Sequence, residues 1–513
     1  MVSKVFSAAL QGLSVKIIEV ETAASRGLRA FNIVGLGDKA ITESKERVAQ
    51  AIKSIKLSPP HQQTKRVLVN LAPADLKKEG SLYDLPIALS YLLASGQTKF
   101  DPSKKIILGE LSLDGFLKPI KGALCFSLAA KEKGYNEIIL PQENAAEAAL
   151  VNLNGEEIKV VGVKDLKQAL RYLEKREDIP SFKVDPLFFE KQTPAFEIEF
   201  SWIQGQDHTK RALEIVASGA HNLLMQGPPG AGKTLLAKAL ISILPKLALS
   251  ELLQLTKIYS AIGTLTKENP FITQRPFRSP HHASSEAALI GGGNPLQPGE
   301  ITLAHRGILF LDEFPEFHRD VLESLRQPLE QGEITIQRAH SSLTFPAKFT
   351  LIAAANPCPC GYHDNPEKEC VCQSSQIASY RRKLSGPLMD RIDIFCQVPS
   401  LKYEELISPE QENTSQKIRE RIEKTREIQR QRFEKDEILT NAEMKIPQIK
   451  KYCQIDSAGQ NILKKYVDSG KLSGRGYHRV LKVARTIADF EGKENISFDN
   501  INEALMYRLR NEA

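Results

Sequence analysis

The sequence predicts a multidomain α/β protein whose last part is all helical. Its 513 residues are too many for one hydrophobic core, and about two to four domains are expected. Short apolar runs alternate with segments of helical spacing over the first 400 residues. From Pro447 onward the spacing is helical throughout. Apolar residues at 42% and charged residues at 26% are ordinary for a globular protein.

The first domain, residues 1–175, mixes strands and helices. Residues 1–20 are mildly apolar but contain Lys4, Gln11 and Lys16, so we interpret them as one first strand and not as a signal peptide. Further strands are predicted at 66–71, 106–111 and 138–140, and helices at 84–93 and 123–133.

Three more segments follow. Residues 176–195 carry charge, three prolines and little periodicity, which predicts a linker. Residues 196–400 alternate strand and helix again, and 401–513 form a helical domain that includes a long charged helix at 416–435.

Composition leaves the partners open. No apolar run reaches the length of about 18 residues needed to cross a membrane, so we expect no membrane partner. A net charge of +7 permits binding to nucleic acid, but an ordinary solvated surface explains it equally well.

A phosphate-binding loop joins a predicted strand at 222–225 to a helix at 235–243. Its glycines allow backbone N–H groups to surround phosphate oxygens at the start of the helix, and Lys233 should contact the β- and γ-phosphates of ATP. Thr234 should bind Mg²⁺. The nucleotide-binding residues are Gly227, Pro228, Pro229, Gly230, Ala231, Gly232, Lys233 and Thr234.

Two carboxylates follow the apolar strand 308–311. Asp312 should hold Mg²⁺, and Glu313 should polarise the attacking water, which predicts hydrolysis of ATP. Alone, such a pair is often only the acidic end of a strand. Next, the apolar strand 349–355 ends at Asn356, which can sense the γ-phosphate or position water.

Four cysteines, Cys358, Cys360, Cys370 and Cys372, crowd into fifteen residues as C-x-C-x9-C-x-C. Four thiolates in a short loop can hold structural Zn²⁺ in a reducing cytoplasm. Because C-x-C is less common in zinc sites than C-x2-C, a loop of free thiols or a redox switch remains the alternative. The other three cysteines are expected in cores.

Longer strings in the chain carry a resemblance. Residues 196–400 resemble the AAA+ module of magnesium chelatase, a three-layer α/β/α fold, and the whole chain resembles the ComM/YifB family of magnesium-chelatase-like AAA+ proteins. The strings are 30–36 (AFNIVGL), 69–76 (VNLAPADL), 278–282 (RSPHH), 356–361 (NPCPCG) and 477–489 (YHRVLKVARTIAD).

The resemblance implies a ring-forming, hexameric ATPase with an extra hairpin before the sensor strand and a helical C-terminal lid. Arg391 matches the arginine finger that acts on the neighbouring subunit, and Arg479 matches the second sensor, with Arg475 as its runner-up. The family implies a cytoplasmic DNA helicase or branch-migration motor in recombination or natural transformation, working on single-stranded or branched DNA with recombination proteins. An ATPase that remodels a protein partner needs the same residues and stays open.

Two segments could reach DNA in the pore of such a ring. Residues 275–306 are rich in glycine, histidine and basic residues, and 333–349 predict a hairpin with Arg338 and His340 at its tip. Their positive charge suits contact with a nucleic-acid backbone regardless of sequence, whereas the alternative is that these loops only brace neighbouring subunits.

Residues 115–124 and 134–141 resemble the Lon protease domain. The overlay puts Tyr83 and Leu124 near the positions of the catalytic serine and lysine, and neither can do that chemistry. Ser81 is close but has no aligned lysine. We therefore expect a binding or assembly domain without protease activity.

Overall fold

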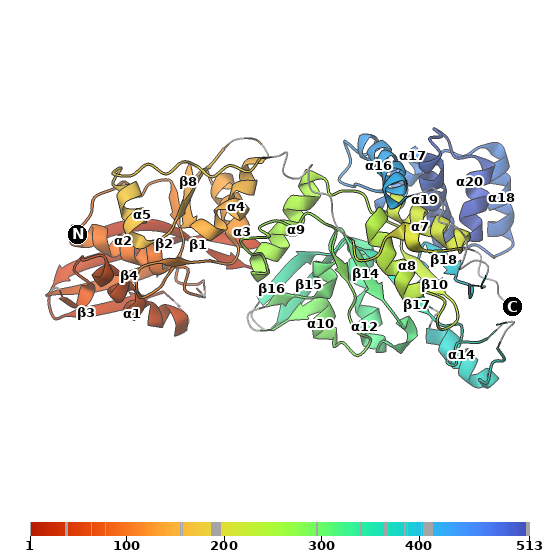
Figure 1. Ribbon diagram of the computed structural model, residues 1–513, viewed down its shortest axis with the longest axis horizontal. Coiled ribbons are helices and arrows are strands. Elements are labelled where there is room, and N and C mark those ends of the chain that lie inside the picture. The colour runs from red at the N-terminus through yellow and green to blue at the C-terminus, as the bar shows by residue number, and fades with distance from the viewer. Residues whose placement is uncertain are drawn as a thin grey trace. The chain divides into compact units, whose positions relative to one another are not determined.

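The structure is a computed structural model that divides into two units, residues 1–193 with 249–273 and residues 194–248 with 274–513 (Figure 1). It describes residues 2–508 except 36–38, 63, 77, 79, 154, 156, 186–195, 294–295, 339–340, 364, 366–367, 384–385, 387, 402 and 404–413. Half of the predicted linker, 186–195, and His340 thus lie outside the described residues. Residues 249–273 belong with the first unit, which differs from the uninterrupted domain expected over 196–400.

The first unit is built on a seven-stranded mixed sheet in the order β3-β4-β2-β1-β5-β8-β9. The strands are β1 (Val2–Gln11), β2 (Ser14–Arg26), β3 (Ala30–Val34), β4 (Lys65–Ala72), β5 (Lys105–Ile107), β8 (Glu137–Pro141) and β9 (Lys159–Val163). The prediction of one strand over 1–20 was wrong. Gly12 adopts a φ of +59°, and Gln11 pairs with Ser14, so the chain makes a tight hairpin there.

The predicted strand 106–111 is also interrupted. Strand β5 ends at Ile107, and Glu110–Leu111 forms β6, which pairs with β7 (Leu117–Lys118). Between them the N–H of Gly109 donates to the carbonyl of Leu82 at 2.8 Å, and its own carbonyl accepts from Leu85 N at 3.0 Å. The backbone of Gly109 therefore bonds to the start of α2 (Asp84–Ser95) instead of a neighbouring strand.

Helices cover both faces of this sheet at β5, β8 and β9, because both faces of these strands are apolar. Ile107 and Ile139 pack with α1 (Lys39–Ser54), α2 and α5 (Leu166–Leu173), whereas Ile106 and Ile138 pack with α3 (Ala123–Glu132) and α4 (Ala145–Ala149). Neighbouring residues of a strand point to opposite faces, so each pair serves two cores. The strands predicted at 66–71 and 138–140 and the two predicted helices are confirmed.

Helix α9 (Leu249–Ile262) packs beside α3 in the first unit (Figure 1). The carbonyl of Ser260 accepts from Gly122 N at 2.9 Å, and its hydroxyl donates to the buried Glu147 at 2.5 Å. The Cys125 thiol donates to the carbonyl of Lys257 at 3.5 Å. These contacts explain why 249–273 belongs to this unit although its sequence neighbours do not.

The second unit contains a five-stranded sheet in the order β11-β14-β17-β10-β18, and all its pairs are parallel. Its strands are β11 (Phe277–Arg278), β14 (Ile308–Leu311), β17 (Thr350–Ala355), β10 (Leu223–Gln226) and β18 (Ile394–Gln397). All four residues of β14 are buried, as expected for a parallel strand covered on both faces. The strands predicted from these apolar runs are confirmed.

The hairpin predicted before β17 is present as β15 (Glu333–Arg338) and β16 (Ser341–Pro346). The side chain of Arg338 lies outside the description, as does His340.

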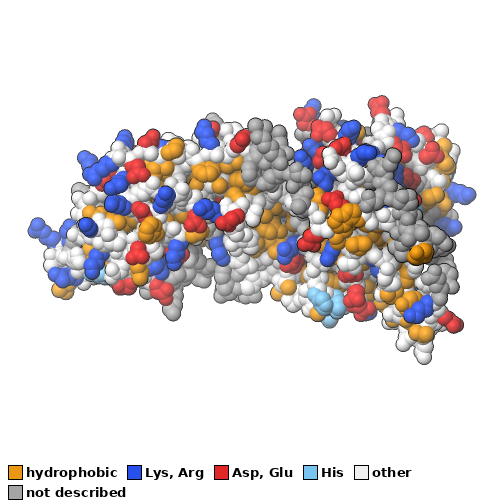
Figure 2. All heavy atoms as spheres, in the orientation of Figure 1, with side chains coloured by type: hydrophobic (Ala, Val, Ile, Leu, Met, Phe, Trp, Pro, Cys, Tyr) orange, Lys and Arg blue, Asp and Glu red, His pale blue; other side chains and the backbone are white. Residues whose placement is uncertain are grey.

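On the face drawn in Figure 2, acidic and basic side chains are interspersed. Among the described residues, no helix has the length and hydropathy needed to cross a membrane.

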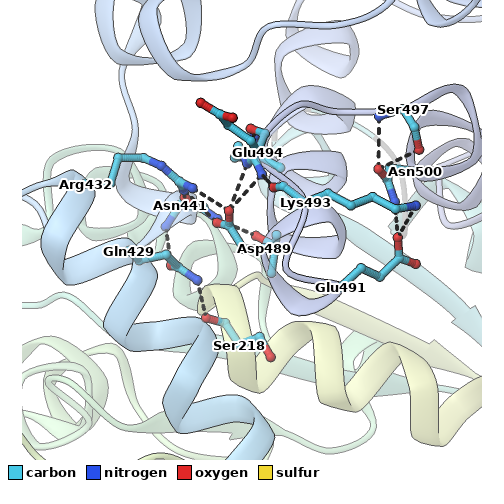
Figure 3. A network of polar contacts seen from close by, with 12 residues as sticks. Ser218, Gln429, Arg432, Asn441, Asp489, Glu491, Lys493, Glu494, Ser497 and Asn500 are labelled. Carbon is cyan, nitrogen blue, oxygen red and sulfur yellow. Dashed lines mark hydrogen bonds and ion pairs between the residues drawn. The ribbon is translucent and has the colours of Figure 1, made fainter.

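The C-terminal helices are α16 (Ser415–Arg432), α17 (Ile446–Tyr452), α18 (Ser457–Asp468), α19 (Gly474–Phe490) and α20 (Phe498–Met506). A polar network centred on Asp489 joins α16 to α19 (Figure 3). The Asp489 carboxylate accepts from Arg432 at 2.6 Å and Asn441 at 2.8 Å. Gln429 of α16 bonds to the carbonyl of Ser218 at 2.9 Å, which ties this helix to α7 (Asp207–Gly219).

Candidate nucleotide site

The predicted nucleotide residues meet where three strands of the parallel sheet end. The phosphate-binding loop follows β10, Asp312 and Glu313 follow β14, and Asn356 follows β17. The carboxyl ends of parallel strands share one edge of the sheet, which is the usual place for a ligand in such a fold. The parallel pairing therefore brings together residues that lie more than one hundred positions apart.

The phosphate-binding loop leads into α8 (Lys233–Ala239), and its glycines are needed for different physical reasons. Gly230 and Gly232 have φ values of +80° and +83°, and an added Cβ at either would meet no atom within 4 Å. The backbone there curves around open space, as a phosphate cradle requires. A Cβ at Gly227 would instead lie 2.2 Å from the carbonyl oxygen of Val398, so the neighbouring strand leaves no room for a side chain.

Lys233 is buried beneath this loop. Its Nζ lies 2.8 Å from the carbonyl of Gly227, 2.9 Å from that of Pro228 and 3.0 Å from Oδ1 of Asn356. Burial lowers the pKa of Lys233, and the nearby Asp312 carboxylate opposes that shift. The ammonium group is thus held at the position from which it can reach phosphate oxygens.

Thr234 and Asp312 form a direct contact. The Thr234 hydroxyl donates to Oδ2 of Asp312 at 2.6 Å, and Oδ1 accepts from the N–H of Glu313 at 2.9 Å. A hydroxyl and a carboxylate are oxygen ligands of the kind that Mg²⁺ selects. Glu313 itself has a φ of +50°, an uncommon conformation for a residue other than glycine, and its side chain is exposed.

The arginines implied by the resemblance lie in ion pairs. Arg391 is buried and paired with Glu330 of α13 (Arg326–Gln331). Arg479 is paired with Asp393, whereas Arg475 forms an exposed pair with Asp390 at 3.4 Å.

Asp393 sits in a buried polar cluster at the start of β18. It also accepts from Asn222 N at 3.0 Å, and its Oδ2 lies 3.5 Å from Nδ1 of His221. Burial alone would raise the pKa of Asp393, but the Arg479 charge and the His221 hydrogen bond outweigh it and hold the pKa well below the usual range. Arg479 is therefore held by a carboxylate that stays ionised.

The four clustered cysteines converge in space. Their Sγ atoms all lie within 4.8 Å of one another, with Cys358 at 3.4 Å from Cys360 and 3.7 Å from Cys370. Four thiolates around one Zn²⁺ ion, each about 2.3 Å from it, would be about 3.8 Å apart. The N–H of Cys360 also donates to the sulfur of Cys372 at 3.3 Å. The donor set and its spacing fit a tetrahedral metal site.

This cysteine cluster adjoins the phosphate-binding loop. Asn356 is two residues before Cys358. Gly361, with a φ of +85°, lies so close to Pro229 that an added Cβ would be 2.4 Å from its ring. The loop that carries the cysteines thus packs against the loop that carries Lys233.

The positions overlaid on the Lon protease pair are closed. Tyr83 and Leu124 are each 0% exposed. The Ser81 hydroxyl donates to the carboxylate of Glu110, which also lies 3.7 Å from Nζ of Lys118. Ser81 therefore bonds to a carboxylate, where the protease pair would require a lysine amine.

Sequence reasoning did not assign a role to His282. Its Nδ1 lies 3.1 Å from Oε2 of Glu313. The residue stands in the RSPHH string quoted above, but nothing in that string indicates which strand end it faces.

Comparisons with known proteins identify the relatives of this chain. The family model for magnesium chelatase, subunit ChlI, matches residues 199–406. A second model, for subunit ChlI of Mg-chelatase, matches residues 20–144, and a third, for the C-terminal part of subunit ChlI, matches residues 412–508. Competence protein ComM of Haemophilus influenzae is 39% identical over 98% of this chain and 97% of its own length. Protein YifB of Escherichia coli is 37% identical over 99% and 97%.

A more distant relative is DNA replication licensing factor Mcm2 of Drosophila melanogaster, which is 27% identical over 46% of this chain and 25% of its own. The full-length matches and the three consecutive family models decide the assignment. The chain belongs to the ComM/YifB family of magnesium-chelatase-like AAA+ ATPases.

Proposed function

We propose that this protein is an ATP-hydrolysing ring motor that acts on DNA as a helicase or branch-migration factor. The observation that carries the proposal is the convergence of Lys233, Thr234, Asp312 and Asn356 beside Glu313 at one sheet edge. Lys233 and the loop glycines hold the phosphates, Thr234 and Asp312 hold Mg²⁺, and bound Mg²⁺ supplies positive charge against the phosphate oxygens. Glu313 accepts a proton from the attacking water, and Asn356 positions that water or senses the γ-phosphate.

A ring gives the two arginines their roles. As the family resemblance implies, Arg391 would be the arginine finger that acts at the active site of the neighbouring subunit. Arg479, as the second sensor, would sense the bound nucleotide. Arg391 is paired with Glu330 and Arg479 with Asp393 within one subunit. Both pairs must therefore open or shift when subunits assemble, and we propose a hexamer as the assembled state.

DNA is the proposed substrate for two reasons. The names of two relatives refer to competence and to DNA replication licensing. In addition, exposed basic residues gather at the end of α14 (Ser374–Lys383), namely Arg381, Arg382 and Lys383. They offer positive charge for a phosphate backbone without reading its bases. The hairpin β15–β16 and segment 275–306 remain the proposed pore loops of the ring. Natural transformation and recombination are the proposed settings.

Two accessory roles complete the proposal. The cysteine cluster holds structural Zn²⁺, for which its four sulfurs are suitably spaced. Residues 1–175 act as a binding or assembly domain related to the Lon protease domain but without its catalytic pair, which the burial of Tyr83 and Leu124 supports.

The test is the steady-state ATPase rate with and without single-stranded or forked DNA. The wild type should be stimulated by DNA, and Glu313→Gln should lower turnover to a small residual rate in both conditions. Glu316→Gln, which changes an exposed carboxylate three residues away, should retain it. Hydrolysis that ignores every DNA tested would contradict the DNA role and favour a protein-remodelling ATPase. If DNA does stimulate hydrolysis, a strand-displacement assay on forked DNA will separate a helicase from an ATPase that DNA merely stimulates.

A further inference from the structure

A histidine from a separate segment contacts the carboxylate that the proposed function places at the water. His282 Nδ1 lies 3.1 Å from Oε2 of Glu313, within hydrogen-bond distance. Glu313 makes this contact although its side chain is otherwise exposed, with 57% of it accessible.

The fold brings His282 to this point through parallel strand pairing. Strand β11 pairs with β14 in the register Phe277 to Ile308 and Arg278 to Leu309. Both strands therefore end at the same edge, so the residues after Arg278 pass close to those after Leu311. Arg278 anchors the segment through two bonds to Glu300, at 2.5 and 2.7 Å.

Packing further restricts the His282 ring. The ring of His281 lies 4.1 Å from it, and the ring of Phe317 meets its edge at 6.5 Å and 81°. Phe317 is only 4% exposed and ends the short 3-10 helix, Phe314–Glu316, that begins directly after Glu313. The ring is thus held between its neighbour and the turn that carries Glu313.

The backbone of Glu313 is fixed, but its side chain needs a partner. Its N–H is bonded to Asp312, and its φ of +50° places it outside the usual regions. A carboxylate that takes a proton from water must direct one oxygen at that water. An imidazole N–H on Oε2 stops rotation of the carboxylate and leaves Oε1 for the water. A contact at Nδ1 requires the tautomer, or the protonated form, with hydrogen on that nitrogen.

We infer that His282 is a positioning residue for ATP hydrolysis, which donates a hydrogen bond to Glu313 and aligns it with the attacking water. This inference rests on the proposed function, in which Glu313 activates that water. A pair this exposed adds little to folding stability, so its effect should be on turnover. A misaligned base costs about 10- to 100-fold in rate.

The test compares kcat and the KM for ATP in His282→Ala, His282→Asn and the control His318→Ala. His282→Ala should lower kcat by about 10- to 100-fold with KM changed by less than about twofold. His282→Asn places an amide N–H near the position of Nδ1 and should recover much of the rate. His318→Ala removes an exposed histidine five residues after Glu313, which pairs with Asp320 at 3.4 Å, and should keep near-wild-type turnover.

A second measurement separates positioning from loop packing. In a Glu313→Gln background, His282→Ala should lower the residual rate no further, because the two residues act as one unit. Full turnover in His282→Ala, an equal loss in His318→Ala or an additive loss with Glu313→Gln would each overturn the inference. If His282→Ala fails to bind ATP, His282→Asn takes its place. Turnover that is largely retained in this variant supports the inference, and turnover that is lost contradicts it. Failure of the proposed function would look different, since wild-type turnover would then be absent or insensitive to Glu313→Gln.

Discussion

The Nζ atom of Lys233 lies 3.0 Å from Oδ1 of Asn356, which joins the loop after one strand to the end of its neighbour. The same nitrogen also bonds to the carbonyls of Gly227 and Pro228. These three acceptors hold the lysine in place before phosphate arrives. Nucleotide binding can then exchange some of these bonds for bonds to phosphate oxygens without moving the backbone.

Lys233→Met should weaken ATP binding by about 10- to 100-fold, because a charged hydrogen bond to phosphate contributes about 1.5–3 kcal/mol. A fluorescent ATP analogue titrated into the protein would measure this. Lys238→Met provides the control, since Lys238 is an exposed lysine on the same helix. Equal binding by wild type and Lys233→Met would contradict the assignment.

Asp393→Asn should destabilise the second unit at neutral pH by about 3 kcal/mol, because it leaves buried partners without their charge. The folded pKa of Asp393 is depressed, so the stability it contributes is present above the unfolded pKa of about 3.9 and is lost as pH falls below it. The difference in the free energy of unfolding between wild type and Asp393→Asn should therefore narrow below about pH 5. Thermal unfolding from pH 7 down to about pH 2.5 would measure it.

The control for this experiment is Asp390→Asn. Asp390 pairs with Arg475 at the surface, where the two side chains are 44% and 66% exposed. Such a pair contributes little, and the variant should unfold with wild type at every pH. A gap between Asp393→Asn and wild type that stays constant with pH would rule out the linkage.

Glu147 should show the opposite dependence. Burial raises its pKa, although bonds from Ser260, Leu124 and Asn144 oppose the shift. A raised carboxyl pKa stabilises the fold at low pH, and that stability is lost as pH rises through the folded value. Glu147→Gln, which stays neutral, should therefore protect the contact with α9 better than wild type at pH 8 and about equally near pH 5.

Hydrogen exchange of segments 120–130 and 249–262 would measure this protection. Glu143→Gln, an exposed neighbour, should match wild type throughout. Faster exchange in Glu147→Gln than in wild type at pH 8 would show that the ionised carboxylate, and not its neutral form, is needed at this contact.

The cysteine cluster should hold one Zn²⁺ per chain under reducing conditions. Elemental analysis of purified protein would measure it, and Cys370→Ser should lose most of the metal because a closed site needs four ligands. Cys453→Ser, which alters a buried cysteine outside the cluster, should keep it. Metal-free wild-type protein would leave the free-thiol or redox interpretation.

The residues of the site were predictable where chemistry follows directly from a local run. A buried strand, a glycine-rich loop and Lys233-Thr234 stand together in the chain, and Asp312-Glu313 directly follow an apolar strand. Hydrophobic patterning also predicted some of the strands and helices, among them β14 and α2. It failed at Gly12 and Gly109, where a turn and a bond to another element interrupt an apolar segment.

Contacts that depend on distant pairing could not be predicted. The approach of His282 to Glu313 follows from the register of β11 and β14, which no local pattern specifies. Likewise, α9 has ordinary helical spacing, and only its bonds to Gly122 and Glu147 place it in the first unit. The pairing of Arg391 with Glu330 is a third example.

The membership of α9 in the first unit limits how this protein can be dissected. A truncated protein beginning at residue 194 would keep Leu249–Ile262 but lose everything against which that helix packs. Leu252, Leu255 and Ile258 are buried in the whole chain and would face solvent in the fragment, which invites aggregation. Loss of ATPase activity in such a fragment would then report a damaged helix as readily as a missing regulatory domain. Replacing 249–273 with a short polar loop in the same deletion would give a cleaner ATPase fragment.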